Sequence, residues 1–171
     1  MINKKLEKAI NDQINAEIYS AYLYLSMSAY FETQNLSGFA NWTYIQYQEE
    51  MSHAMKFFRY INGRGGVVEL NKIDKPENTW KDVVAVFKQV LKHEQYVTSR
   101  INNLVTIARE IKDYATESFL QWYVDEQVEE ESNAEDLLAK LEMVKDSKPG
   151  LLMMDKELQT RVFVDETLSK K

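Results

Sequence analysis

Six polar residues of this chain repeat at a constant offset of 77 positions, and this repeat restricts the fold more than any other feature. Each half contains one Glu, followed 33 positions later by a pair with i, i+3 spacing. On a helix, such a pair lies on one face, about one turn apart. Two halves that face each other would gather five oxygen-bearing side chains and one imidazole in one place. The residues are Glu17, Glu50 and His53 in the first half, and Glu94, Gln127 and Glu130 in the second.

These residue types favour a metal site that is rich in carboxylates. The chain has no Cys, which excludes disulfides, thiolate zinc sites, iron–sulfur clusters and a Cys nucleophile. With two His residues, an all-His site is excluded as well. Oxygen-rich sites favour Fe, Mn, Mg or Ca over Cu, and the repeat is suited to a pair of iron-type ions. A net charge of −6 argues against a nucleic-acid partner.

The sequence predicts an all-α fold with four long helices. Five Gly and two Pro in 171 residues leave long stretches uninterrupted, and apolar residues recur with the helical period. Asn3 and Ser37 are candidate N-caps, and Gly63 marks a helix end. The predicted helices cover residues 3–31, 37–63, 79–110 and 113–144.

The connections predict a four-helix bundle with one long crossover. Short turns at 34–36 and 111–112 require antiparallel neighbours. Residues 63–78, with a strand-like stretch at 67–70, are long enough when extended to run the length of the bundle. The repeated polar residues lie near the mid-points of their helices, so the bundle places them at one level.

A short fifth helix is predicted near the C-terminus. Pro149 and Gly150 interrupt the fourth helix, and an amphipathic stretch at 151–158 follows. We expect one domain over 1–171, with the bundle at about 3–145, the fifth helix at about 149–160 and a loose tail at 164–171. A small apolar helix outside a complete bundle predicts contact with another subunit, as does a first helix that is apolar all round.

The N-terminus and the hydropathy pattern indicate a cytoplasmic protein with no membrane partner. Residues 1–7 lead directly into a helical pattern and lack the apolar core of a signal peptide. No apolar stretch approaches the roughly 18 residues of a membrane span.

Each candidate ligand has a simpler structural interpretation. Glu17 and Glu94 could be surface charges, but both continue the apolar stripes of their helices. His53 could be a core histidine, but Glu50 three positions earlier favours a ligand. His93 lies one position off the stripe of Glu94 and is interpreted as a structural or surface residue.

The acidic run at 125–131 has the same ambiguity, because most such runs are solvated faces. We assign that role to Asp125 and Glu131. The neighbouring Trp122 and Tyr123 place positions 126, 127 and 130 on the inward side of the helix.

Three stretches resemble the ferritin family, and closely the non-haem ferritins of bacteria and archaea. They are residues 15–22 (NAEIYSAY), 49–54 (EEMSHA) and 127–131 (QVEEE), and the resemblance covers nearly the whole chain. The arrangement of carboxylates is the one known for ferritin-like di-iron bundles. The resemblance implies a ferritin-like four-helix bundle with one long crossover and a short fifth C-terminal helix.

The resemblance also assigns roles by position. Glu17, Glu50 and His53 match the ligands of a first iron, and Glu50 bridges to a second iron that Glu94 and Glu130 complete. Gln127 matches a hydrogen-bonding neighbour of the dioxygen site, and Tyr24 matches a tyrosine near the centre. A third iron site is implied at the residues Glu49, Glu126, Glu129 and Glu130. Asp113 and Glu117, near the start of the fourth helix, are candidates for an entry pore.

The implied function is iron storage and detoxification with ferroxidase activity. Two Fe(II) ions bind, dioxygen oxidises them, and Fe(III) passes to a mineral inside a homo-oligomeric shell, usually of 24 subunits. The cofactor set is therefore non-haem Fe(II)/Fe(III), with a di-iron centre and a third iron site. The fifth helix lines one symmetry axis in such shells.

Related classes remain as alternatives. Bacterioferritins and rubrerythrin-like peroxidases have Glu-x-x-His in the second half, where this chain has Gln127-x-x-Glu130. Met51 occupies the position that resembles the bacterioferritin haem ligand, so haem binding stays an alternative. Mini-ferritins that bind DNA lack the fifth helix. A scaffold without catalytic role would require the repeat to be accidental.

Overall fold

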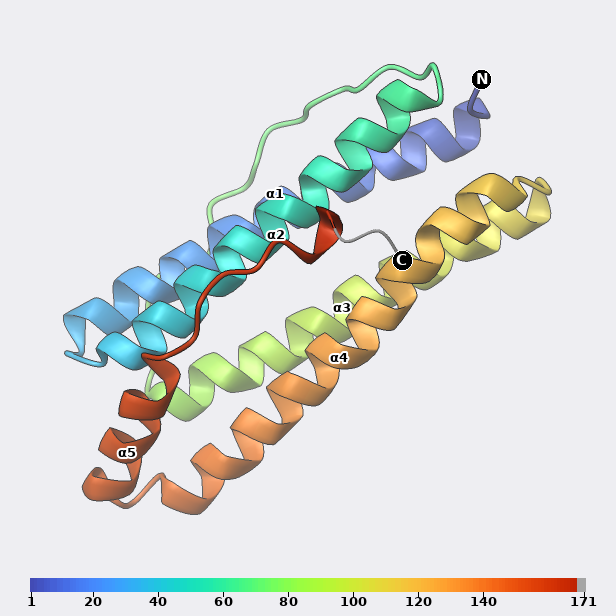
Figure 1. The fold of residues 1–171 in the computed structure, drawn as a ribbon. Coiled ribbons are helices and arrows are strands. Elements are labelled where there is room, and N and C mark those ends of the chain that lie inside the picture. Colours follow the sequence, from blue (N-terminus) through green and yellow to red (C-terminus); the bar gives the residue numbers. More distant parts are fainter. Residues whose placement is uncertain (169–171) are drawn as a thin grey trace.

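A computed structural model describes residues 1–168 of the chain, and within this range the fold is entirely helical. Four long helices form a bundle, and a short fifth helix packs at one end (Figure 1). The helices are α1 (Lys4–Thr33), α2 (Ser37–Gly63), α3 (Val83–Glu110), α4 (Tyr114–Val144) and α5 (Lys148–Leu158), followed by a single 3₁₀ turn at Glu166–Leu168. The predicted all-α bundle is confirmed.

Two helical hairpins make up the bundle, as the short turns predicted. Asn35 and Lys112 adopt left-handed backbone conformations, with φ of 56° and 57°, in the α1–α2 and α3–α4 turns. The crossover then runs along the outside of α1 and α2 to the start of α3 (Figure 1). This path makes α2 and α3 parallel, so all four mid-points lie at one level.

The crossover differs from prediction in two details. Residues 67–70 form no strand; instead, the Asn11 side chain donates to Val67 O and accepts from Glu69 N, both at 2.9 Å. An asparagine on α1 thus takes the place of a neighbouring strand. The third helix begins at Val83 rather than near 79, because Asp82 caps it by accepting from Ala85 N at 2.8 Å.

The start of α2 also corrects the prediction, because Ser37 is its first helical residue and not its N-cap. The cap comes from α5: Asp155 Oδ1 accepts from Gly38 N at 2.8 Å and from Phe39 N at 3.0 Å. A Cβ at Gly38 would lie 1.6 Å from the carbonyl oxygen of Asp155, so only glycine allows this approach. Asn3, by contrast, caps α1 as predicted.

The fifth helix thus packs on its own bundle and still exposes apolar side chains. Met154 is buried, whereas Leu152 is 61% and Met153 75% exposed. After α5 the chain runs back along α2, and the expected tail from residue 164 continues there to Leu168 (Figure 1). Residues 169–171 lie outside the described range.

The apolar core has two parts with a polar layer between them. One part, near α5, includes Phe31, Phe39 and Phe87. The other, at the opposite end, includes Phe57 and Leu120. The repeated polar residues lie in the helical segments between these clusters, so both ends of the bundle hold them in place.

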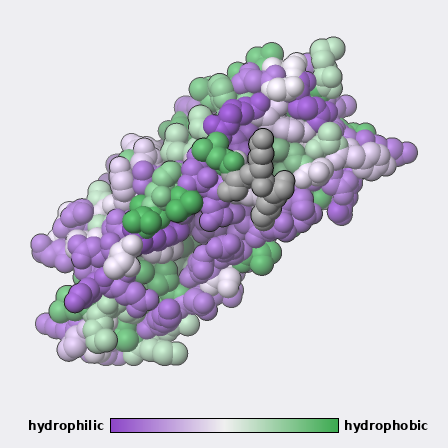
Figure 2. Space-filling view, viewed as in Figure 1, coloured by the Kyte–Doolittle hydropathy of each residue, from purple (hydrophilic) through white to green (hydrophobic). Residues whose placement is uncertain are grey.

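Hydrophilic residues cover most of the face in Figure 2, and hydrophobic residues form separate patches. Over residues 1–168, no helix carries an apolar stretch that could cross a membrane.

The cap from α5 gives a first prediction. In Asp155→Ala, the amides of Gly38 and Phe39 lose their acceptor, and we expect their hydrogen exchange to accelerate about 5- to 30-fold, as a cap worth about 1–2 kcal/mol implies. Glu157→Ala removes an exposed carboxylate from the same helix and serves as the control. Equal exchange in both variants would show that Asp155 does not stabilise this helix start.

Candidate metal centre

The repeated residues meet in the middle of the bundle, each on the helix that the sequence predicted. Glu17 comes from α1, Glu50 and His53 from α2, Glu94 from α3, and Gln127 and Glu130 from α4; all six are buried. Burying five acidic groups or amides and an imidazole inside a bundle is costly unless each has a partner. The partners therefore decide what the layer can do.

The first half of the repeat forms a cluster suited to one cation. Ligand atoms of Glu17, Glu50 and His53 all lie within 4.8 Å of one another. Within residues 1–168, Glu17 Oε2 and Glu50 Oε2 are buried and have no hydrogen-bond partner. Buried carboxylate oxygens without a hydrogen-bond donor are rare, because no interaction compensates the free energy lost when water is removed from them. Two carboxylates and an imidazole fit Fe, Mn or Zn, and the unpaired oxygens fit a cation between them.

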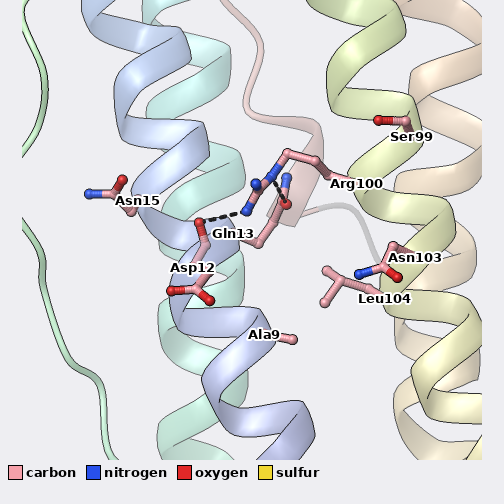
Figure 3. A pocket seen from close by; sticks show the side chains of 8 residues that line it. All are labelled: Ala9, Asp12, Gln13, Asn15, Ser99, Arg100, Asn103 and Leu104. Carbon is pink, nitrogen blue, oxygen red and sulfur yellow. Dashed lines mark hydrogen bonds between the residues drawn. The ribbon is translucent and has the colours of Figure 1, made fainter.

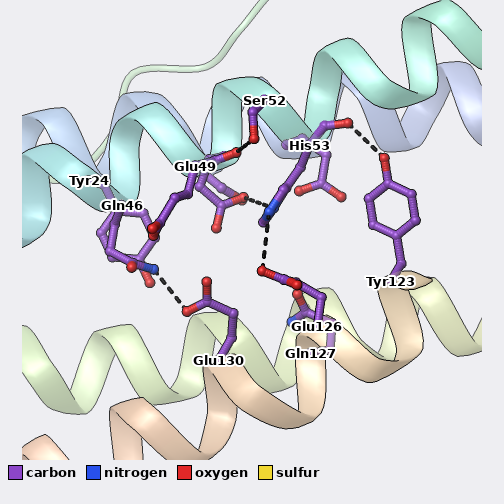
Figure 4. Close-up of polar contacts among 12 residues, drawn as sticks. Tyr24, Gln46, Glu49, Ser52, His53, Tyr123, Glu126, Gln127 and Glu130 are labelled. Atoms are coloured by element: carbon purple, nitrogen blue, oxygen red, sulfur yellow. Dashed lines mark hydrogen bonds and ion pairs between the residues drawn. The ribbon is translucent and has the colours of Figure 1, made fainter. Parts of the chain in front are cut away.

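The second half is held by hydrogen bonds instead. Tyr24 Oη donates to Glu94 Oε1, and Gln127 Nε2 donates to Glu94 Oε2 at 3.2 Å. Gln46 Nε2 donates to Glu130 Oε2 at 2.9 Å (Figure 4). These donors orient the carboxylates of Glu94 and Glu130.

Burial and mutual repulsion raise the pKa values of these carboxylates. Desolvation, and then the charge of Glu130, raises the pKa of Glu94 to about 8. Desolvation also raises the pKa of Glu50 well above its usual range, although His53 opposes this shift. The pKa of Tyr24 rises for the same reason, with Glu94 as the next cause. The raised pKa of Glu94 favours a proton on this carboxyl group at neutral pH, and a cation would have to displace that proton.

The residues expected at a third iron site lie on one side of this layer. His53 Nε2 is 3.6 Å from Glu126 Oε1 (Figure 4), and the exposed Glu129 lies one turn further along α4. Together with Glu49 and Glu130, they line a cavity of about 260 Å³.

A cation from the C-terminal segment already occupies part of this cavity. Arg161 Nη2 lies 2.7 Å from Glu49 Oε2, and its guanidinium packs 4.9 Å from the Trp42 ring centroid. Burial raises the pKa of Glu49 to about 7, and Arg161 opposes that shift. Sequence reasoning missed Arg161, because it follows the last long helix and belongs to no periodic pattern.

Sequence reasoning also missed two buried glutamines, although a signal was present. Gln13 and Gln46 each lie four positions before a repeated Glu, Glu17 and Glu50, and an i, i+4 pair shares one helix face. Gln13 Nε2 donates to Glu17 Oε1 at 2.8 Å, whereas Gln46 reaches across to Glu130.

The other candidate residues have structural contacts. His93 is hydrogen-bonded to Ser20 Oγ at 2.8 Å, and burial lowers its pKa to about 4, so it is neutral. Asp113 caps α4 and pairs with Arg64 at 2.9 Å, and Glu117 pairs with Arg109 at 2.7 Å.

Three further positions complete the comparison with the sequence. Asp125 is exposed, as expected. Glu131 is only partly exposed and accepts from Thr98 Oγ1, which corrects its assignment as a solvated charge. Met51 lies partly buried on α2.

Comparison with known proteins agrees with this geometry. Residues 7–144 match the Ferritin-like domain family. The chain belongs to the ferritin family.

Among its relatives are bacterial non-heme ferritins. The protein of Staphylococcus aureus (strain MRSA252) is 42% identical over 166 residues, which are 97% of this chain and 100% of the relative. That of Bacteroides fragilis (strain 638R) is 45% identical over 161 residues, 94% of this chain and 100% of the relative. The expected resemblance to non-haem ferritins is thereby confirmed.

Solved ferritins from Archaeoglobus fulgidus share the fold. A closed form engineered by site-directed mutagenesis superposes with a TM-score of 0.95 at 50% identity, covering 96% of this chain and 100% of that one. An open-pore ferritin of the same archaeon superposes with a TM-score of 0.93 at 51% identity, covering 94% and 98%.

The raised pKa of Glu94 predicts proton release on metal binding. At pH 7 a carboxyl group with a pKa of about 8 is mostly protonated, and a cation can bind only its ionised form. We expect Co(II) binding at pH 7 to release protons, and its affinity to rise between pH 6 and pH 8. Calorimetry in two buffers of different ionisation enthalpy measures the number of protons.

The variant Glu94→Gln cannot lose this proton, so we expect it to release about one proton fewer per subunit. Glu135→Gln, an exposed change on α4, is the control. Equal proton release from wild type and Glu94→Gln would show that Glu94 is not the source of the proton.

Proposed function

We propose that this protein stores iron and oxidises Fe(II) with dioxygen at the centre formed by the repeated residues. One observation carries the proposal: Glu17, Glu50 and His53 converge in the core, and two of their carboxylate oxygens have no hydrogen-bond partner within residues 1–168, although Glu50 Oε2 lies 3.7 Å from His53 Nδ1. Such an arrangement is costly without a cation and favourable with one.

The two halves would then hold two Fe(II) ions as substrate. Glu17 and His53 would bind the first ion, and Glu50 would bridge to the second, as the family resemblance implies. Glu94 and Glu130 bind the second ion after Glu94 loses its proton. Each Fe(II) gives one electron to dioxygen, so two Fe(II) and two protons convert one dioxygen to hydrogen peroxide. The five oxygen- or nitrogen-bearing side chains would stabilise the Fe(III) products electrostatically.

Two further residues would shape the second position. Tyr24 holds Oε1 of Glu94, so that Oε2 can turn toward a cation once its hydrogen bond from Gln127 is broken. Gln127, which donates to Glu94 at 3.2 Å, can donate to a dioxygen-derived ligand once Glu94 binds iron.

We further propose a homo-oligomeric shell, of 24 subunits as the family resemblance implies, with the mineral inside. The membership in the ferritin family and the exposed apolar side chains of α5, Leu152 and Met153, support subunit contacts at this helix. We expect these contacts at the symmetry axis that the fifth helix lines in ferritin shells.

Removal of a ligand should slow oxidation without unfolding the bundle. In Glu94→Ala and in His53→Ala, we expect the oxidation of the first two Fe(II) per subunit to slow about tenfold or more. Glu94→Ala removes a negative charge that would bind the second ion, and His53→Ala removes a ligand of the first ion. Stopped-flow absorbance of Fe(III) after mixing with aerobic buffer measures this rate, and native mass spectrometry checks assembly.

The chain supplies its own control in its other histidine, His93, which is partly buried. His93→Gln keeps a hydrogen-bonding group beside Ser20 and should leave the initial rate unchanged. Normal oxidation in both ligand variants would refute the site assignment.

The third position calls for variants with opposite effects. Glu126→Ala removes a carboxylate from the cavity, and Arg161→Leu removes the cation that competes for Glu49. By Coulomb's law, the first should weaken and the second should strengthen the binding of a third cation.

Neither variant should change the first burst of oxidation by much. We expect the number of Fe(II) oxidised per dioxygen, and the recovery of activity after the first turnover, to fall in Glu126→Ala and to rise in Arg161→Leu. Oxygen-electrode measurements at increasing Fe(II) test this. Loss of the burst in Glu126→Ala would instead assign Glu126 to the di-iron centre, since it lies 3.6 Å from His53.

A further inference from the structure

Arg100 connects α3 to α1 beside the metal centre. It crosses a cavity of about 520 Å³ between these helices (Figure 3). Its Nε donates to Gln13 Oε1 at 2.8 Å, and its Nη2 donates to Asp12 O at 2.9 Å. No metal ligand lies among these contacts, so Arg100 has no place in the centre described above.

The arginine determines which way the Gln13 amide points. A guanidinium can only donate hydrogen bonds, so the atom of Gln13 that faces Arg100 must be the carbonyl oxygen. The NH₂ group must then face the other way, where it donates to Glu17 Oε1 at 2.8 Å. Gln13 is only 1% exposed, so water does not compete for this amide.

The result is a chain of hydrogen bonds from the surface to a ligand. Arg100 orients Gln13, and Gln13 occupies Oε1 of Glu17. The remaining oxygen, Glu17 Oε2, is the buried one without a partner in residues 1–168. One oxygen is thus held while the other is left for a cation.

Gln46 provides a comparison within the same centre. It donates to Glu130 at 2.9 Å, but its own Oε1 is buried and has no partner in the described part of the chain. The Gln46 amide therefore lacks the anchor that Gln13 receives from Arg100. The anchoring is particular to the Glu17 side and is not a general property of glutamines in this core.

We propose that Arg100 is a positioning residue that acts through Gln13 to hold Glu17 ready for the first metal ion. This inference rests on the proposed metal centre. Groups that orient metal ligands typically change metal affinity 10- to 100-fold when they are removed. We expect Gln13→Leu to weaken Co(II) binding by about that factor, and Arg100→Leu by about tenfold.

A double-mutant cycle separates this role from general destabilisation. Since Arg100 acts through Gln13, Arg100→Leu should cost little further affinity in the Gln13→Leu background. Arg100→Lys retains a donor and should recover part of the affinity. Co(II) titration followed by ligand-field absorbance, with no dioxygen chemistry involved, measures both affinity and coordination.

Two further variants make the outcomes distinguishable. Lys88→Leu removes a cation from the same helix, where it pairs with Glu142 at 2.8 Å, and should leave Co(II) affinity unchanged. Glu17→Ala should abolish the first Co(II) site. If Glu17→Ala loses that site but Arg100→Leu binds as wild type does, or if the two losses are additive, the positioning role is wrong. If Glu17→Ala binds Co(II) normally, the metal centre itself is wrong.

Discussion

The burial of like-charged carboxylates in the middle of the bundle is the constraint on which the rest of the structure depends. Glu17, Glu50, Glu94 and Glu130 share one layer, and their burial raises the pKa values of Glu50, Glu94 and Glu130. Without cations, protons and hydrogen-bond donors compensate this layer only in part. Stability, proton content and metal binding are therefore linked, since whatever binds the layer also stabilises the fold. The two apolar clusters supply the stability that such a layer does not.

Helices, topology and ligands could be predicted because they follow periodic patterns. Long apolar stripes and short turns define two antiparallel hairpins, and the offset of 77 places the same positions at one level. Details that depend on contacts between segments distant in the sequence could not be predicted. Asp155, which caps α2 at Gly38, is more than a hundred positions away in the sequence. Asn11 on α1 forms the hydrogen bonds to residues 67–70 that a neighbouring strand would otherwise form. Local patterns carry no information on such partners.

The same division applies to the metal centre. Gln13 has the i, i+4 spacing to Glu17 and was open to prediction, but the role of Arg100 depends on where α3 passes α1. Arg161 reaches Glu49 only because the chain returns along α2 after α5 (Figure 1). In both cases a partly buried arginine at a position outside the repeat reaches a polar residue beside the buried acidic layer. The repeat identifies the candidate ligands. The tertiary fold determines which charged side chains, such as Arg100 and Arg161, come close enough to orient these ligands or to compete for them.

The two halves of the repeat have equivalent positions on their helices, but the side chains at and around these positions differ. The counterparts, 77 positions later, of Gln13, Tyr24 and Gln46 are Val90, Ile101 and Tyr123, so none of the three supporting roles is repeated. His53 likewise corresponds to Glu130, which gives one half a nitrogen ligand and the other only oxygen. Among residues 1–168, one oxygen each of Glu17 and Glu50 in the first half has no hydrogen-bond donor, whereas Tyr24, Gln127 and Gln46 donate to the carboxylates of the second half. A cation should therefore enter the proposed first position at lower cost, because the hydrogen bonds to Glu94 and Glu130 must first be broken at the second. Asymmetric support in a symmetric bundle would thus impose an order of binding on the two proposed positions.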